Sequence, residues 1–292
     1  MRYLYLLTVS FSLMNLVVAD PATESKAKAG DVEAQYDLGQ LYWHGDGVKR
    51  DVTKAVGWFR KSAAQGHAKA QFSLATAYET GEGIDQSLRE AAKWYRKSAE
   101  KGNKDSQTQL GFFYAKGKGL VKNEGQAVYW WKKASAQGQK VAQAHLGVRF
   151  ATGIGVAKNT VTAVKWWSKS AEQGNMLAQY NLAVMYSDGV GVEQNFRKAV
   201  RWYRSAAKLG DGDAQNNLGN MYARGQGVRK DSVRAYMWYF IARKNGNTDA
   251  KANTYALLMG DGEKTLKQKN REIEKAIALA DACIENHYKN CK

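Results

Sequence analysis

Proline is almost absent from this chain, which has a single proline, Pro21, against 28 glycines in 292 residues. Because proline interrupts helices, a chain without proline after residue 21 can be helical nearly throughout. Hydrophobic residues make up 44% of the chain and aromatic residues 11%, which excludes a disordered basic protein. The length allows a sizeable hydrophobic core.

Cysteine is also scarce, since Cys283 and Cys291 are the only two. In an oxidising compartment such a pair is most simply a disulfide, and two free thiols are the alternative. Eight residues of unbroken helix would hold the two Cα atoms about 12 Å apart, whereas a disulfide needs them within roughly 7 Å. If the bond forms, we therefore expect the helix to stop between the two cysteines, around 286–290.

Long hydrophobic runs are missing except at the N-terminus. Residues 1–19 carry one positive charge, Arg2, followed by an apolar stretch that is short for a membrane span. Small or short residues precede Asp20, as signal-peptidase cleavage requires. We predict a signal peptide over 1–19, a periplasmic or secreted location, no lipid anchor and no transmembrane segment.

Acidic residues are in the minority, with 27 Asp and Glu against 44 Lys and Arg, and the formal net charge is +17. Such a charge suits nucleic acid, an anionic membrane or an acidic protein as partner. Export argues against nucleic acid, so we expect none.

Motifs for catalysis and for metal or cofactor binding are missing as well. The GxG pairs never extend to GxGxxG. Two S-x-x-K tetrapeptides, at 98–101 and 205–208, lack the S-D-N and K-T-G motifs that accompany them in penicillin-recognising enzymes. The four histidines form neither HExxH nor i, i+4 pairs. We expect no enzymatic activity, no cofactor and no metal site.

Internal repetition dominates the sequence, with a fixed step of 36 residues. The segment AVKWWSKSAEQGN at 163–175 returns as AAKWYRKSAEKGN at 91–103 and in four further copies. The repeated tryptophan keeps the step at Trp58, Trp94, Trp130, Trp166, Trp202 and Trp238. We predict a linker at 20–29, then six units at 30–65, 66–101, 102–137, 138–173, 174–209 and 210–245, and a degenerate repeat with a C-terminal cap at 246–292.

Each unit has the pattern of two amphipathic helices. In the first unit, helix A over 32–44 and helix B over 51–65 each place apolar residues at spacings of three and four. Helix A has a small residue at its centre, such as Gly39, although glycine costs about 1 kcal/mol there relative to alanine. We predict that the repeated tryptophan of helix B, Trp58 in this unit, packs closely against it. A long helix over 263–285 is expected to cap the stack.

These patterns resemble the Sel-one-like repeat family, relatives of the tetratricopeptide repeats. The resemblance rests on AQxxLG in helix A (34–39), on the GxGV turn (45–48) and on AxxWxxxAAxxG in helix B (55–66). It implies an all-α solenoid, in which antiparallel helix pairs wind into a right-handed superhelix and serve as an adaptor or scaffold. It also implies the class of partner: an envelope component, a toxin effector that the chain would neutralise as an immunity protein, or a host protein. Some cysteine-rich relatives have been proposed as β-lactamases, but this chain lacks their cysteine pair in each repeat, so a cell-wall or β-lactam hydrolase is the weaker alternative.

By analogy with tetratricopeptide repeats, helix A is expected to line the concave face. The helix-A positions that differ between units form a stripe whose identity packing has not dictated. The partner-binding candidates on it are Tyr36, Gln40, Trp43, His44, Phe72, Thr76, Phe112, Val148, Tyr180 and Val184. Large aromatic residues are typical binding anchors, and the alternative is that some of them only pack between neighbouring A helices.

Basic pairs gather on helix B, as at 60–61, 96–97 and 132–133. We expect them on a solvated outer surface, and the alternative is attraction to an anionic membrane or an acidic partner. We expect the chain to act as a monomer.

Overall fold

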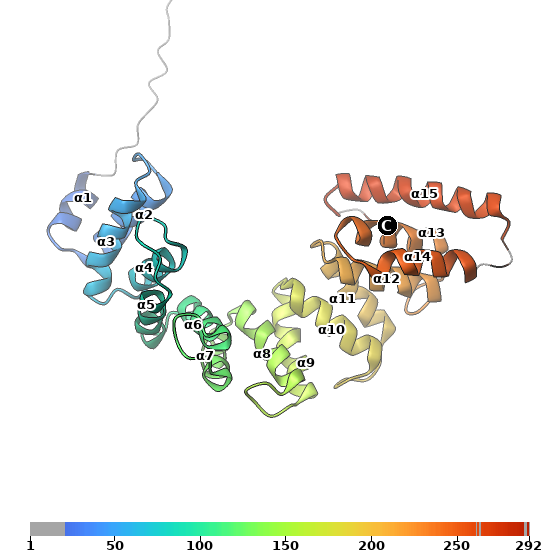
Figure 1. Ribbon diagram of the computed structural model, residues 1–292, viewed down its shortest axis with the longest axis horizontal. Helices are drawn as coiled ribbons and strands as arrows, with labels where there is room; N and C mark the ends of the chain where they lie inside the picture. Colours follow the sequence, from blue (N-terminus) through green and yellow to red (C-terminus); the bar gives the residue numbers. More distant parts are fainter. Residues whose placement is uncertain (1–20, 261, 263, 289–290, 292) are drawn as a thin grey trace, which may run out of the picture. The chain divides into compact units, whose positions relative to one another are not determined.

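The structure, a computed structural model, describes residues 21–260, 262, 264–288 and 291, so the predicted signal peptide lies outside the described residues. Within this part of the chain the secondary structure is helical, and the helices fall into two compact units, Met1–Lys122 and Asn123–Lys292 (Figure 1). The N-terminal unit contains α1 (Pro21–Lys28), α2 (Val32–His44), α3 (Val52–Ala64), α4 (Ala68–Thr80), α5 (Leu88–Glu100) and α6 (Lys104–Lys116). The C-terminal unit contains α7 (Glu124–Ala136), α8 (Lys140–Thr152), α9 (Thr160–Glu172), α10 (Met176–Asp188), α11 (Phe196–Ala207), α12 (Gly212–Arg224), α13 (Ser232–Lys244), α14 (Asp249–Gly260) and α15 (Leu266–Glu285).

Within each unit, successive helices from α1 to α6 and from α7 to α14 pack against one another, whereas α15 packs against α13. Helix A and helix B of one repeat are in contact, as α2 with α3 and α8 with α9, and helix B contacts the next helix A, as α3 with α4 and α9 with α10. This arrangement of stacked helix pairs confirms the predicted all-α solenoid.

The helix boundaries follow from capping residues that recur with the repeat. The predicted helix A at 32–44 is α2 itself, which begins after Asp31, whose carboxylate accepts a hydrogen bond from the Ala34 amide at 2.8 Å. It ends at Gly45, whose φ of 81° is the left-handed conformation that terminates helices. Asp51 caps α3 by accepting from the Lys54 amide at 2.9 Å.

The prediction that the repeated tryptophan packs on the small residue of helix A is wrong. The ring that lies there belongs to the next residue of helix B: a Cβ added at Gly39 would lie 2.6 Å from the ring of Phe59, and one at Gly219 would lie 2.6 Å from the ring of Tyr239. All members of this second-aromatic position are buried: Phe59, Tyr95, Trp131, Trp167, Tyr203 and Tyr239.

The repeated tryptophan occupies a different side of helix B. Trp58 packs against the cluster around Leu38, and Lys61 Nζ lies 4.0 Å above its ring. Trp130 and Trp238 are buried. The other four tryptophans of the series are only half-buried: Trp58, Trp94, Trp166 and Trp202. Because neighbouring helix positions are about 100° apart, one wide apolar arc contains both aromatic positions.

A buried glutamine ties each helix A to the helix before it. Gln71 Nε2 donates to the Ala63 carbonyl at 3.1 Å, and Gln35 donates to the Ala27 carbonyl of α1 at 3.1 Å. The same bond is made by Gln107, Gln143, Gln179 and Gln215. The segment 20–29, which we expected to be a linker, therefore holds a helix, and its Ala27 stands one repeat step before Ala63. It takes the place of a preceding helix B and covers the first helix A.

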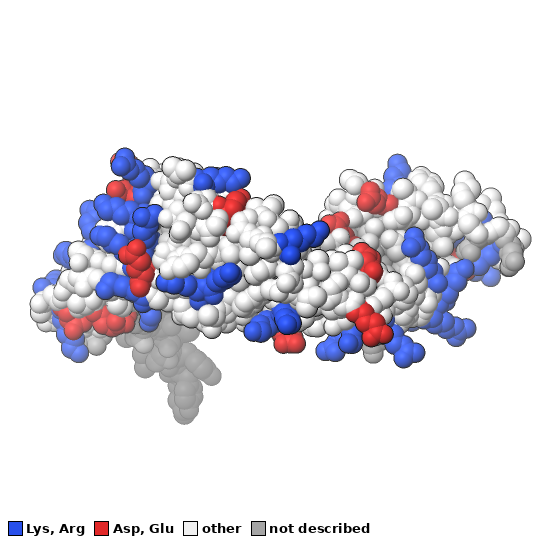
Figure 2. Space-filling model, turned by 90° about the horizontal axis from the view of Figure 1, so that it is seen from below, with Lys and Arg blue, Asp and Glu red and all other residues white. Residues whose placement is uncertain are grey.

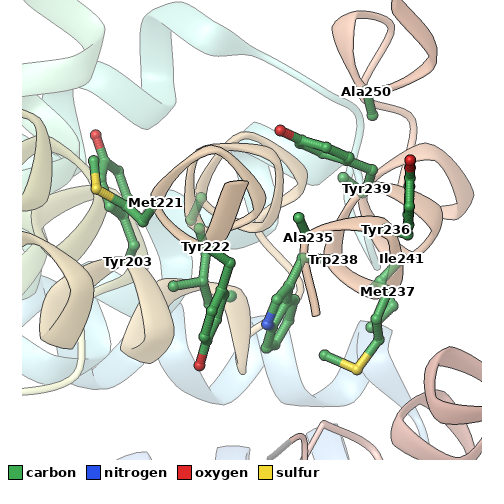
Figure 3. Packing of buried hydrophobic residues seen from close by; sticks show 14 of the residues in the cluster. Tyr203, Met221, Tyr222, Ala235, Tyr236, Met237, Trp238, Tyr239, Ile241 and Ala250 are labelled. Atoms are coloured by element: carbon green, nitrogen blue, oxygen red, sulfur yellow. The ribbon is translucent and has the colours of Figure 1, made fainter. Parts of the chain in front are cut away.

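The C-terminal unit ends in a cap that surrounds α13. This helix contacts α12, α14 and α15. Its rings Tyr236, Trp238 and Tyr239 point in three directions (Figure 3), and each is at most 2% exposed. A helix covered on all sides needs no polar face, which explains why helix B of the sixth unit departs from the repeat pattern.

The helix α15 begins three residues later than predicted because Thr265 forms a capping box with Gln268. It ends at Glu285, and the chain then turns so that Cys283 and Cys291 form a disulfide with their Cα atoms 5.0 Å apart. The helix thus stops between the two cysteines, as a bond between them requires.

Reduction of this disulfide is expected to lower the free energy of unfolding of the C-terminal unit by about 2 kcal/mol, because the bond closes a loop whose ends are eight residues apart. Differential scanning calorimetry with and without reductant measures the effect. A variant with both cysteines changed to serine is the control and should not respond to reductant. An unchanged melting temperature of the native chain on reduction would contradict the prediction.

Candidate functional site

The A-helix side of the N-terminal unit contains a cavity of about 140 Å³, which we call the α2–α4 cavity. It is lined by Gln40, Trp43, His44, Phe59, Phe72, Ser73 and Thr76. Five of the ten predicted binding residues therefore meet at one place. Pockets for small ligands begin at about 300 Å³, so this cavity suits a single apolar side chain.

Phe59 was not among the predicted site residues, although it lines the α2–α4 cavity. It projects from α3 across Gly39, and its ring centroid lies 5.9 Å from that of Trp43 and 6.0 Å from that of Tyr36. A signal for it exists in the sequence: an aromatic residue follows the repeated tryptophan in every unit, and its type changes between Phe, Tyr and Trp.

The rim of the cavity is polar and internally hydrogen-bonded. Gln40 Nε2 donates to Tyr36 Oη at 2.6 Å and lies 3.5 Å from Ser73 Oγ. The Gln40 Oε1 atom lies 3.2 Å from His44 Nε2, and since an amide oxygen only accepts, the histidine donates. Gln40 is thereby held in place, while the exposed His44 ring keeps one nitrogen for a partner.

The second wall of the cavity is supported by a buried tyrosine. The Phe72 ring centroid lies 5.8 Å from that of Tyr95, whose hydroxyl lies 3.2 Å from Thr76 Oγ1 and donates to Glu79 Oε2 at 2.8 Å. Lys118 Nζ donates to the other oxygen of Glu79 at 3.1 Å. Burial raises the pKa of Tyr95 well above its ordinary value, so the phenol stays protonated and holds this wall at any physiological pH.

The C-terminal unit has its own cavity of about 400 Å³, which we call the α10–α12 cavity. Tyr180 and Val184, both predicted, line it together with Tyr203, Asp188 and Arg224. The ring of Tyr203 lies 6.2 Å from that of Tyr180, and burial raises the pKa of Tyr203 as it does for Tyr95. The walls of this cavity are more polar than those of the α2–α4 cavity.

Three predicted residues line neither cavity. Tyr36 lies beside the α2–α4 cavity and contacts its lining residues, whereas Phe112 is half-buried on α6. Val148 packs against the buried cluster around Trp167. Val148 therefore fits the alternative given above, that some residues of the stripe only pack between neighbouring helices.

The structure also places the basic pairs and bears on metal ligands and membrane spans. The basic pairs of helix B at 60–61, 96–97 and 132–133 are exposed. Among the described residues, no three His, Cys, Asp or Glu side chains are grouped to hold a metal ion. None of the helices described has the length and apolar character to span a membrane.

Comparison with known proteins connects this architecture to a family. The model of the Sel1 repeat matches residues 32–67, 68–103, 104–139, 140–175, 177–211 and 212–247. A sel1-like repeat-containing protein of Acanthamoeba polyphaga mimivirus is 51% identical over 39 residues, which are 13% of this chain and 7% of that protein.

Two crystal structures resemble the chain over most of its length. A protective antigen of uropathogenic Escherichia coli with an SLR fold is 31% identical, with a TM-score of 0.79 over 91% of this chain and 58% of that one. A Sel1 repeat protein from Oxalobacter formigenes is 32% identical, with a TM-score of 0.65 over 76% of this chain and 95% of that one. This chain thus spans well under two thirds of the antigen and a small part of the viral protein. Since six successive units match and the stacked pairs are shared, the chain belongs to the Sel1 repeat family, whose repeats mediate protein–protein interactions.

Proposed function

We propose that the chain is an exported protein-binding scaffold, and that its N-terminal unit captures a partner by taking an apolar side chain into the α2–α4 cavity. The observation that carries this proposal is the meeting of five non-repeating residues around one apolar cavity with a polar rim. The partner classes in view are an envelope component, a toxin effector and a host protein.

The side chains of the α2–α4 cavity have the features of an interface anchor. Trp43 and Phe72 are large and apolar, yet both stay half-buried. Burial of the exposed part of these rings by a partner would stabilise the complex. The hydrogen bonds of Gln40 and the contacts of Tyr95 hold the cavity walls in place before binding. Binding therefore costs little side-chain conformational entropy.

The disulfide supports the exported location that we propose. Such bonds persist in oxidising compartments and are rare in the cytosol. Fractionation of cells that express the chain, with thiol alkylation of each fraction, tests this part.

Changing Phe72 to alanine is expected to weaken the binding of partner peptides by about 30-fold or more, as truncation of an interface anchor does. Peptides selected on the full chain from a displayed library, and expected to share one apolar residue, are the probes. Fluorescence anisotropy measures their affinity.

The matched control is Tyr129→Ala, which removes an aromatic ring that is 46% exposed on α7, outside the cavity. It should leave the affinity unchanged. Equal binding by the native chain and the Phe72→Ala variant, with both folded by circular dichroism, would contradict the proposed site.

A further inference from the structure

A second cavity of about 930 Å³ lies in the C-terminal unit, and we call it the basic cleft. It shares no lining residue with the α10–α12 cavity. Its walls come from the ends of α11 and α12, the turn between α12 and α13, the start of α13, and the cap around α15. Its basic residues are Arg204, Lys208, Arg229, Lys230, Arg234 and Lys264.

Two acidic residues line the same cleft, and both are already engaged. Asp231 caps α13 by accepting from the Arg234 amide at 2.9 Å, and its other oxygen pairs with the Arg234 guanidinium at 2.5 Å. Glu272 pairs with Lys264 Nζ at 2.8 Å. Within each of these two pairs the opposite charges neutralise one another. The remaining basic residues of the cleft therefore have no acidic counterpart there.

Four cations of the cleft therefore lack a neutralising charge. Arg204 Nη2 donates to the Tyr222 hydroxyl at 3.0 Å, a neutral acceptor. Lys208, Arg229 and Lys230 are exposed and form no ion pair with any described residue. Figure 2 shows basic side chains gathered at the right-hand end of the molecule, within this unit. A concave surface with one sign of charge concentrates ligands of the opposite sign.

The arrangement of these cations distinguishes between kinds of anion. A phosphate group favours a free helix N-terminus, but at the start of α13 the Asp231 carboxylate already takes that position. The four unneutralised cations instead come from two separate segments, since Arg204 and Lys208 stand one helical turn apart at the end of α11 and Arg229 and Lys230 lie on the turn before α13. Apolar groups line the same cleft, namely Val228, Val233 and the half-buried Cys291.

We propose that the basic cleft binds an acidic segment of a partner protein, with spaced carboxylates on the four cations and the chain of the segment along the apolar groups. The inference rests on the proposed function as a protein-binding scaffold, and it adds a second contact of a different chemistry. The apolar anchor and the acidic segment would then engage separate units of the chain.

The test measures binding of a fluorescein-labelled peptide with glutamate at alternate positions to the full chain at low ionic strength. The cleft variant Lys208→Ala, Arg229→Ala, Lys230→Ala is expected to bind about tenfold more weakly or worse. The matched control, Lys165→Ala, Lys251→Ala, Lys275→Ala, removes the same charge from exposed positions outside the cleft and should change the affinity by less than about twofold. Circular dichroism confirms that both variants are folded.

Equal weakening by the two variants would overturn the proposal, because it would show attraction to net charge alone. Cleft-dependent binding of inositol hexakisphosphate or of phosphatidylglycerol vesicles, without binding of the peptide, would overturn it in favour of a phosphate ligand. Phe72→Ala should still bind the acidic peptide. If library-selected peptides bind through Phe72 while the acidic peptide does not bind, this inference fails and the proposed function stands.

Discussion

Replacing Trp167 by alanine is expected to lower the free energy of unfolding of the C-terminal unit by about 3–5 kcal/mol, the usual cost of deleting a buried tryptophan ring. Trp167 is 2% exposed, and its indole Nε1 donates to the Ala144 carbonyl at 3.1 Å. The ring lies directly on Gly147 of α8. The substitution therefore leaves a cavity between α8 and α9 and removes this hydrogen bond between the two helices.

The adjacent residue supplies the matched control. Trp166 is half-buried, so part of its ring is already exposed to water in the folded protein. Lys169 Nζ lies 5.0 Å from the centroid of its ring. Trp166→Ala should cost only about 1–2 kcal/mol. Urea denaturation followed by circular dichroism gives the free energies, and hydrogen exchange locates the loss to the C-terminal unit. If Trp166→Ala proved as costly as Trp167→Ala, the assignment of the two aromatic positions would be wrong.

This pair of tryptophans also shows where prediction from the sequence ends. Recurrence of a residue in every unit predicts that it packs within or between the units, but not which side of the helix makes the closest contact. The invariant Trp58 position packs beneath a lysine, and the variable Phe59 position takes the close contact with Gly39. Identity at a position was therefore a poor guide to depth of burial.

The candidate site was predictable where the A helices supply it, since the predicted Phe72 and Thr76 of α4 line the same cavity as residues of α2. Gln40, Trp43 and His44 share one face of α2, so helical spacing placed them together in advance. Phe59 reaches the same cavity from α3 through the gap above a glycine, which no spacing within α2 can reveal. The basic cleft is harder still, because α11, the turn before α13 and the cap around α15 meet only through tertiary packing.

Changing Gly155 to alanine is the second substitution with a large expected effect, about 2–5 kcal/mol of unfolding free energy, from strain at positive φ and overpacking together. Gly155 is the second glycine of a GxG turn and has a φ of 73°. A Cβ there would lie 2.6 Å from the carbonyl oxygen of Glu124, at the start of the preceding helix B. Backbone cannot move aside as a flexible side chain can, so the two repeats must separate.

The first glycine of the same turn isolates the contribution of the backbone contact. Gly153 has a similar φ of 79°, but the nearest atom to a Cβ there would be Lys158 Cβ at 3.2 Å, and the nearest backbone atom lies at the ordinary contact distance of 3.5 Å. Gly153→Ala should therefore cost about 1–2 kcal/mol, the strain of the left-handed conformation alone. Urea denaturation of both variants measures the difference, and equal losses would rule out a role for the contact with Glu124. A larger loss at Gly155 would mean that the second glycine sets the distance between neighbouring repeats, and with it the spacing of the A helices that carry the binding residues.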